Sequence, residues 1–214
     1  MDSQTTSATM AKTTAAMNQR QRRLARVASG KWRAKKAKVA AAVARAKAKK
    51  AASIKIKINN LTDVKMIDKL YDASRAGVKV QLIIRGICCL IPGVAGMSEN
   101  IEAISIVDNY LEHSRVYIFA NNGNPDIYIS SADFMTRNID ARVEVSCPIY
   151  DEDVKKELID SFDVGWKGNV KARLHSEKLD NKYRVRNEDE RIFRAQIETY
   201  NYYRDKLEVN LDEK

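Results

Sequence analysis

Residues 110–138 read YLEHSRVYIFANNGNPDIYISSADFMTRN. Within this stretch, VYIF (116–119) and DIYIS (126–130) predict two strands joined by a polar, Asn- and Gly-containing turn, which is the pattern of a β-hairpin. Polar side chains stand at both ends of the hairpin: His113, Arg115, Ser130, Ser131 and Asp133. A buried strand usually continues into apolar residues, so these polar ends are either solvated or part of a binding site.

The flanking sequence predicts an α/β fold. IKIKINN (54–60) alternates with period two and predicts a strand, and VKVQLIIRG (78–86) predicts a strand buried on both faces. Between them, Asp63 is placed to cap a helix through MIDKLYDASRA, which Gly77 ends. We expect Ser98 to begin a second helix through IEAISIVDNYLEH, its N-terminus offering backbone N–H groups to an anion.

The C-terminal part continues the alternation of strands and helices. ARVEVSCPI (141–149) and VKARL (170–174) predict strands, and EDVKKELIDSF (152–162) predicts a helix. A long terminal helix is expected over residues 187–208. Because one antiparallel hairpin is set among strand–helix units, the fold class predicted is α/β with a mixed sheet flanked by helices.

The net charge of +10 is unevenly distributed. Residues 1–50 hold eight lysines and six arginines against one acid, Asp2, and so carry +13, which leaves the rest of the chain at −3. We therefore divide the chain into a basic Ala/Lys/Arg-rich tail, 1–52, and a domain, 53–214. The tail has no apolar stripe wide enough to dock on a core.

Three interpretations of the tail remain open. It is a solvated tail, disordered or partly helical; an arm that binds nucleic acid or another polyanion through residues 12–50; or an organelle transit peptide. A signal peptide is excluded because the start lacks an apolar stretch.

Three cysteines, two of them Cys88 and Cys89, provide neither a disulfide framework nor zinc-ligand spacing. Buried reduced thiols in a cytoplasmic protein are expected. No run approaches the length of about 18 apolar residues that spans a membrane.

Arg85 ends a predicted strand, where the ligands of open α/β sheets bind. A strand-end salt bridge explains this arginine equally well, and helix-end capping explains His113. Taken together with Arg115, Arg137 and the Ser130–Asp133 segment, these residues predict a site for a phosphorylated ligand, since arginine matches phosphate oxygens in a bidentate way.

Three motifs, IRGICCLIPG, SIVDNYLEHSRVYIF and ISSADFMTRN, closely resemble the C-terminal domain of the long, multi-domain type of bacterial polyphosphate kinase. The resemblance covers about Ile54 to Leu207 and implies a phospholipase D-like fold. In that wider group the site is His-x-Lys followed by a Gly-Ser-x-Asn-like segment. His113-Ser114-Arg115 and Ser130-Ser131-Ala132-Asp133 look like a variant with Arg in place of Lys.

The resemblance implies reversible transfer of the terminal phosphate of ATP to polyphosphate, through a phosphohistidine and with magnesium. It implies that Arg85 and His113 contact the ATP phosphates and that His113 is catalytic. The implied substrate-binding set is Arg85, His113, Arg115, Ser130, Ser131, Asp133 and Arg137. His175 matches no required histidine and is expected at the surface.

The phosphohistidine, an adenine-side tyrosine and the magnesium ligands of that family lie in upstream domains that this sequence does not resemble. The chain is therefore expected to be inactive alone and to need a partner chain with those domains. The alternative is a non-catalytic module that binds polyphosphate or nucleic acid through its tail. A face left exposed by the missing domains would favour a homo-oligomer.

Overall fold

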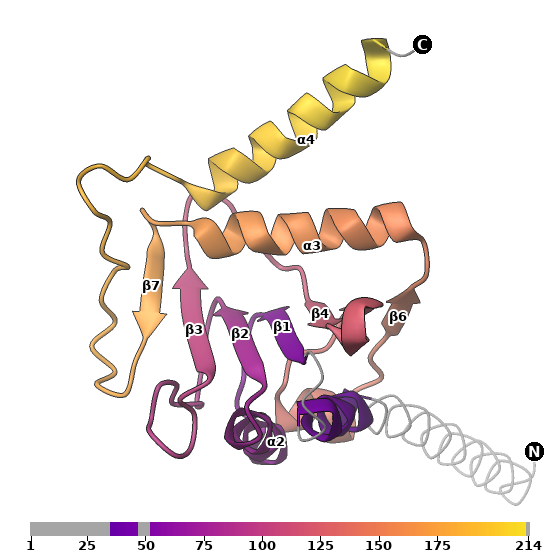
Figure 1. Ribbon diagram of the computed structural model, residues 1–214, viewed down its shortest axis with the longest axis vertical. Helices are drawn as coiled ribbons and strands as arrows, with labels where there is room; N and C mark the ends of the chain where they lie inside the picture. The colour runs from indigo at the N-terminus through magenta and orange to yellow at the C-terminus, as the bar shows by residue number, and fades with distance from the viewer. Residues whose placement is uncertain (1–34, 47–51, 213–214) are drawn as a thin grey trace, which may run out of the picture.

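The computed structural model describes residues 35–46 and 52–212. Its centre is one seven-stranded sheet in the order β6-β5-β4-β1-β2-β3-β7 (Figure 1). The strands are β1 (Ser53–Ile58), β2 (Lys79–Ile84), β3 (Ile101–Ile106), β4 (Val116–Phe119), β5 (Asp126–Ser130), β6 (Ser146–Ile149) and β7 (Ala172–His175). Strands β1, β2 and β3 are parallel, whereas β4, β5, β6 and β7 each join antiparallel to a neighbour.

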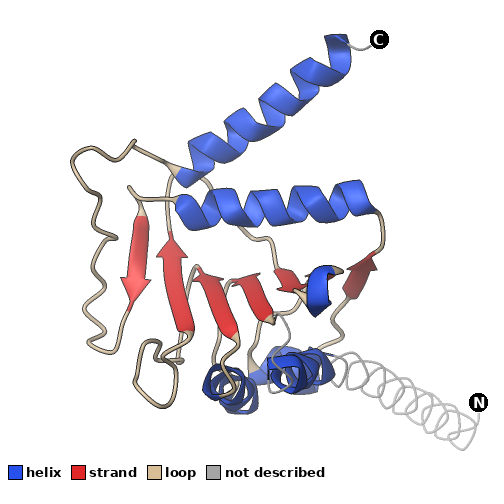
Figure 2. Ribbon diagram, in the orientation of Figure 1, coloured by secondary structure: helices blue, strands red, loops and turns tan. Residues whose placement is uncertain are grey.

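Helices cover both faces of this sheet (Figure 2). Helix α2 (Val64–Arg75) and the helical residues 35–46 lie on one face, and α3 (Glu152–Lys167) lies on the other, with α4 (Ala195–Asp212) beyond it (Figure 1). A short 3-10 turn (Asn121–Gly123) and a π-helical turn (Arg137–Ala141) flank β5. The predicted mixed α/β sheet flanked by helices is confirmed.

Because the residues of β1 alternate between apolar and polar, the strand contacts the helices on both faces of the sheet. Its three isoleucines are fully buried in the cluster formed with α2 and residues 35–46. Its lysines point to the opposite face, where Lys55 Nζ lies 2.5 Å from Asp163 of α3. The hairpin and the α2 unit also follow the prediction: Asp63 accepts a hydrogen bond of 2.9 Å from the backbone N–H of Met66, and Gly77 has φ of +83°.

The prediction of a helix that begins at Ser98 is wrong. Residues 101–106 are strand β3, paired in parallel with β2, and the Ser98 hydroxyl instead donates to the carbonyl of Ile91 within a turn. The spacing of isoleucines in this stretch fits either period, and pairing along the sheet outweighs it. No helix N-terminus is therefore available there for an anion.

Two other elements, β6 and the terminal helix α4, begin later in the sequence than predicted. Strand β6 begins only at Ser146, because Glu144 and Val145 bond to side chains across the preceding loop. The terminal helix begins at Ala195 rather than at residue 187. The segment before this helix stays extended because its backbone bonds to the side chain of Asn169: Asn169 donates to the carbonyl of Arg191 and accepts from the N–H of Phe193.

The expectation that the basic tail does not dock on a core is wrong for residues 35–46. Val39 and Ala42 are 1% and 2% exposed, and Val43 and Ala46 pack against the same cluster. Small alanines leave a narrow apolar stripe, but Val39 fills the space over the sheet. The parts of the tail at residues 1–34 and 47–51 lie outside the described residues.

Other predictions on single residues also need correction. The cysteines were expected to be buried, but Cys89 and Cys147 are exposed and Cys88 is only half-buried. His175 is half-buried rather than fully at the surface: its Nε2 atom is buried without a hydrogen-bond partner among the described residues, and burial lowers the pKa of the ring. None of the helices described is long and apolar enough to cross a membrane.

Candidate functional site

Asp133 is the centre of the candidate site. Strand β1 ends one residue before Asn59, whose backbone N–H donates to Asp133 Oδ1 over 2.8 Å, and Asn60 Nδ2 donates to Oδ2 over 3.0 Å. Arg115 adds a two-pronged contact, with Nε 3.0 Å from Oδ1 and Nη2 3.3 Å from Oδ2. The segment after β5 is thereby tied to the ends of β1 and β4.

The charge of Asp133 is maintained although the side chain is buried. Burial by itself would raise the pKa of the carboxyl, but the donors from Arg115, Asn59 and Asn60 outweigh it and hold the pKa below its ordinary value. A carboxylate that accepts several hydrogen bonds favours its ionised form. Asp133 is therefore a fixed anion that orients Arg115.

Arg115 in turn contacts His113. Nη1 lies 3.2 Å from His113 Nδ1 and also 3.2 Å from the His113 carbonyl oxygen, while Nη2 lies 3.4 Å from Nε2. The imidazole is exposed. Asp133, Arg115 and His113 thus form one chain of contacts that ends in a solvent-facing ring.

Arg85 lies beside the contacts that join Asp133, Arg115 and His113. It follows β2, and its Nη1 donates to the carbonyl of Glu112 over 3.2 Å, one residue before His113. Glu112 is held in place by Lys57 and by Gln196 of α4, whose Nε2 lies 2.9 Å from Oε1. The predicted proximity of Arg85 to the His113 segment is therefore found in the structure.

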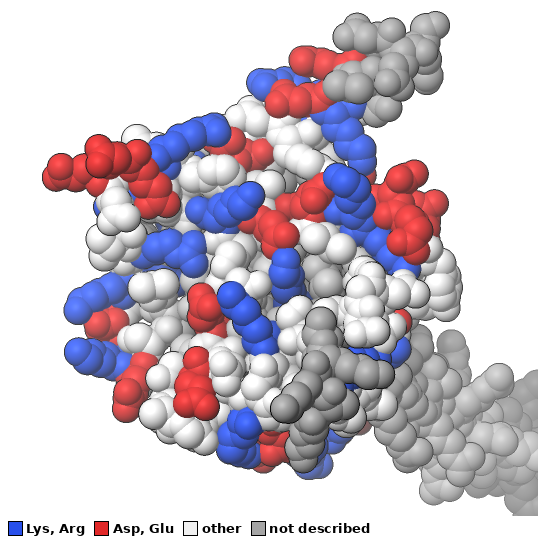
Figure 3. Space-filling model, viewed as in Figure 1, with Lys and Arg blue, Asp and Glu red and all other residues white. Residues whose placement is uncertain are grey.

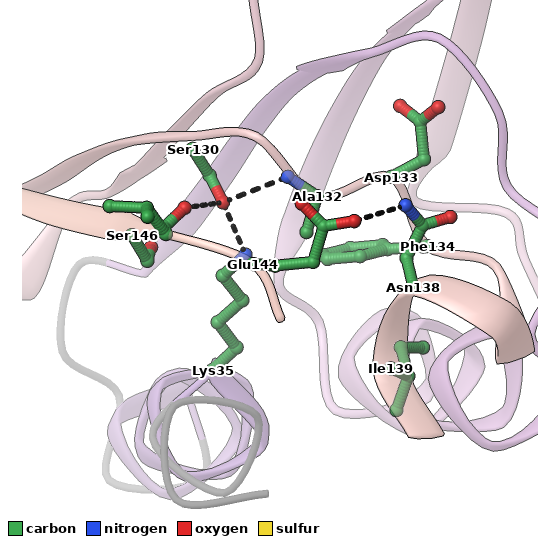
Figure 4. A pocket seen from close by; sticks show the side chains of 10 residues that line it. Lys35, Ser130, Ala132, Asp133, Phe134, Asn138, Ile139, Glu144 and Ser146 are labelled. Atoms are coloured by element: carbon green, nitrogen blue, oxygen red, sulfur yellow. Dashed lines mark hydrogen bonds between the residues drawn. The ribbon is translucent and has the colours of Figure 1, made fainter. Parts of the chain in front are cut away.

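The two serines are placed differently. Ser130 Oγ donates to the Val145 carbonyl over 2.8 Å and accepts from Lys35 Nζ over 3.1 Å (Figure 4). Ser131 Oγ donates to Glu144. Their hydroxyls are committed to partners within the chain, on the side of a small cavity. Arg137 is exposed on the π-helical turn, and the hydrogen bonds of Arg85 and His113 among the described residues do not include it.

Sequence reasoning missed several residues of this region. Asn59 and Asn60 directly follow a predicted strand, and the strand-end rule that singled out Arg85 would have found them. Lys35 is one of many lysines in a low-complexity run, so no sequence signal distinguishes it. Both side-chain polar atoms of Asn59 are buried without a partner among the described residues.

The arrangement presents donors to a negatively charged group. Arg85 follows the end of β2 and His113 precedes the start of β4, with β1 between these two strands. Arg115 is held in place beside them by Asp133. Such groups suit phosphate oxygens. Within residues 35–46 and 52–212, no three His, Cys, Asp or Glu side chains are grouped to hold a metal ion.

This α/β domain with an anion-accepting edge is similar to known kinase domains. Residues 27–196 match the family model of the polyphosphate kinase C-terminal domain 2. The chain belongs to this family. The match begins ahead of the boundary at residue 52/53 that the charge distribution suggested.

Polyphosphate kinases from three bacteria agree with this family assignment. The chain is 51% identical over 151 residues to the polyphosphate kinase of Vibrio cholerae and 49% identical to that of Escherichia coli, with 71% of this chain covered in both cases. The crystal structure of polyphosphate kinase from Porphyromonas gingivalis matches 80% of this chain with a TM-score of 0.78 and 40% identity. A phospholipase D family member from Salmonella typhimurium matches 64% of this chain with a TM-score of 0.46 and 15% identity.

The matched region is a minor part of each relative. It spans 21% of the Vibrio cholerae protein, 22% of the Escherichia coli protein and 26% of the Porphyromonas gingivalis chain.

Proposed function

We propose that this chain is the part of a polyphosphate kinase that contacts the ATP phosphates during reversible phosphoryl transfer between ATP and polyphosphate. The observation that carries the proposal is the family match together with the placement of Arg85 beside the His113–Arg115–Asp133 chain of contacts. A solvent-facing imidazole with a guanidinium next to it suits the charge of a transferring phosphoryl group.

The roles of the chain's residues follow from their positions. Arg85 binds phosphate oxygens, and His113 donates to, or accepts a proton from, the reacting phosphate. Asp133 holds Arg115, and Arg115 holds the imidazole. Ser130 supports the loop that carries Asp133 rather than the ATP phosphates, because its hydroxyl has partners inside the chain.

Turnover requires groups that lie outside the matched region. The matched region covers about a fifth of the curated kinases, and phosphoryl transfer depends on a complete set of positioning groups. Magnesium, which the family resemblance implies, is not matched by the side chains described: none of them form a carboxylate cluster for it. Its ligands are proposed to lie outside the matched region as well.

The test is to mix the full chain with the upstream part of a polyphosphate kinase and to measure polyphosphate formed from ATP. We expect polyphosphate from the mixture and little from either protein alone. In calorimetric titrations, Arg85→Ala should weaken MgATP binding by about tenfold, because one charge-assisted contact to phosphate is lost.

Arg75→Ala is the matched control. It removes an arginine from an exposed ion pair on α2, with 49% of the side chain accessible, and should leave MgATP affinity unchanged. A mixture that forms no polyphosphate from ATP rules out the proposed function.

The charge of the basic tail favours a second candidate, a module that binds polyanions without catalysis. Residues 1–50 carry +13, whereas the face of the folded part seen in Figure 3 interleaves basic and acidic side chains. Three basic residues of the docked segment already serve the fold, as Lys35, Lys38 and Arg45 bond to Ser130, Asp126 and Asn121. Polyanion binding would therefore depend on the other basic residues of the tail, most of which lie before position 35 or at positions 47–50.

Salt dependence separates the two candidates. Replacing Arg20, Arg22, Arg23 and Arg26 by Gln should weaken binding of single-stranded nucleic acid and flatten the plot of log affinity against log salt, because fewer counterions are released. MgATP binding should be unaffected by the same change. Nucleic-acid binding that keeps its salt slope in this variant counts against the arm.

A further inference from the structure

A second group of polar and charged side chains lies about the cavity shown in Figure 4, and Arg85 is not among the residues that line it. The cavity is bounded on one side by Lys35 of the helical segment 35–46. On the other side lie Ser130 and residues 132–134, the π-helical turn and the loop that carries Glu144. Its volume is about 20 Å³, which is room for about one water molecule.

Lys35 is an unusual lysine because it is only 8% exposed. Nζ donates to Ser130 Oγ over 3.1 Å and lies 4.1 Å from the centroid of the Tyr117 ring. No carboxylate of the described residues lies within ion-pair distance of it. A buried ammonium is ordinarily paired, so a neutral hydroxyl and a ring leave its charge incompletely compensated.

Glu144 shows that the same cavity holds an anion. Its Oε1 accepts from Asn138 Nδ2 over 2.6 Å, and its Oε2 accepts from Ser131 Oγ. The backbone N–H of Val145 donates to Ser131 Oγ over 2.9 Å and so fixes the hydroxyl for this role. A carboxylate from the chain itself therefore occupies donors that suit an external oxyanion.

The charges around Lys35 oppose one another. Burial lowers the pKa of Lys35 to about 8; the negative charge of Glu144 partly offsets this, and the positive charge of Arg115 adds to it. Asp133 and the Tyr117 ring complete the surroundings, and burial together with Asp133 keeps the Tyr117 hydroxyl neutral by raising its pKa. An added anion beside Nζ would stabilise the ammonium form.

We propose that Lys35, Ser131 and Asn138 form a subsite for one phosphoryl group of a linear phosphate chain, and that Glu144 occupies it until the phosphate displaces its carboxylate. The proposal rests on the proposed polyphosphate kinase function and names a second contact for the polyphosphate substrate. Because the cavity is too small for a phosphoryl group while Glu144 is inside, binding requires that the side chain swings out.

Two substitutions with opposite expected signs test the subsite on the full chain. With tripolyphosphate as the probe and no magnesium, Lys35→Met should weaken binding by about tenfold, as a charge-assisted donor is lost. Glu144→Gln should tighten binding severalfold, since it removes the competing negative charge. Lys36→Met removes the same charge from the neighbouring position and should change little.

The pH profile provides a readout that a purely structural role would not move. Wild-type affinity for tripolyphosphate should fall above about pH 8, as Lys35 loses its proton before binding. Lys35→Arg keeps the charge and should show a smaller fall, and the titration of the probe itself is common to both proteins. Each affinity is measured again in the Arg85→Ala background to remove binding at the first site.

The subsite is overturned if Lys35→Met binds tripolyphosphate as tightly as the wild type, if Glu144→Gln weakens binding, or if the wild type does not bind the probe. None of these results alters the test of the proposed function, which is polyphosphate formation with an upstream partner. Conversely, opposite effects of Lys35→Met and Glu144→Gln would stand even if the mixture formed no polyphosphate.

Discussion

Replacing Asp133 by Ala is expected to lower the free energy of unfolding by about 3–5 kcal/mol, the range for removing one partner of a buried ion pair. Asp133 is 4% exposed, and the Arg115 side chain that it binds is 11% exposed. Without the carboxylate, the guanidinium and the donors of Asn59 and Asn60 lose a shared acceptor. Both the unpaired charge and the unsatisfied amides would then remain partly buried.

Urea unfolding followed by circular dichroism measures this cost. Lys79→Ala is the matched control, because Lys79 and Glu102 form an exposed pair at 3.9 Å and its loss should change the free energy by less than about 0.5 kcal/mol. The double variant Arg115→Ala/Asp133→Ala should cost less than the sum of the single variants, since neither charge is left alone. Additive costs would show that the two side chains do not depend on each other.

Because the pKa of Asp133 is lowered in the folded state, the stability that Asp133 contributes depends on pH. A carboxyl whose pKa is lower in the folded state contributes stability above its unfolded pKa, near 4, and this contribution is lost as the pH falls through the folded value. The wild type should therefore lose more stability than Asp133→Asn when the pH is lowered below about 4. Equal losses would mean that Asp133 is not the group being protonated.

This ion pair also shows how far sequence reasoning extends. The hairpin, the cap of α2 and the strand β1 follow from local signals: period two, a capping Asp, and a Gly with positive φ. Arg115 and Asp133 were singled out because charged residues at strand ends are unusual. That they bind each other depends on the register of β4 and β5, which the hairpin turn largely determines.

What sequence reasoning missed depended on distant contacts. Strand β3 has a spacing of apolar residues compatible with a helix, and only its pairing with β2 and β7 decides the matter. Ser130 and Ser131 bond to a loop 13 to 15 residues further along the chain, and no local sequence signal indicates those partners. Lys35 reaches Ser130 across 95 residues, a contact that composition could not predict.

The second large effect concerns the basic segment, which composition separated from the domain. Val39→Asp is expected to lower the free energy of unfolding by about 3 kcal/mol: burial of a valine is worth about 1.5–3 kcal/mol, and an unpaired carboxylate over the sheet adds to the cost. Val39 is 1% exposed and packs in the cluster that contains the isoleucines of β1.

Ala40→Asp provides the control, because it introduces the same charge on the same helix at an exposed position. It should change the free energy by less than about 0.5 kcal/mol in the same urea experiment.

Val39→Asp should also weaken tripolyphosphate binding as Lys35→Met does, since a helix that leaves the sheet takes Lys35 out of the cavity. If both Asp variants unfold like the wild type, residues 35–46 are an appendage and the domain begins at β1. If only Val39→Asp is destabilised, the segment is part of the folded domain, as the family match from residue 27 indicates.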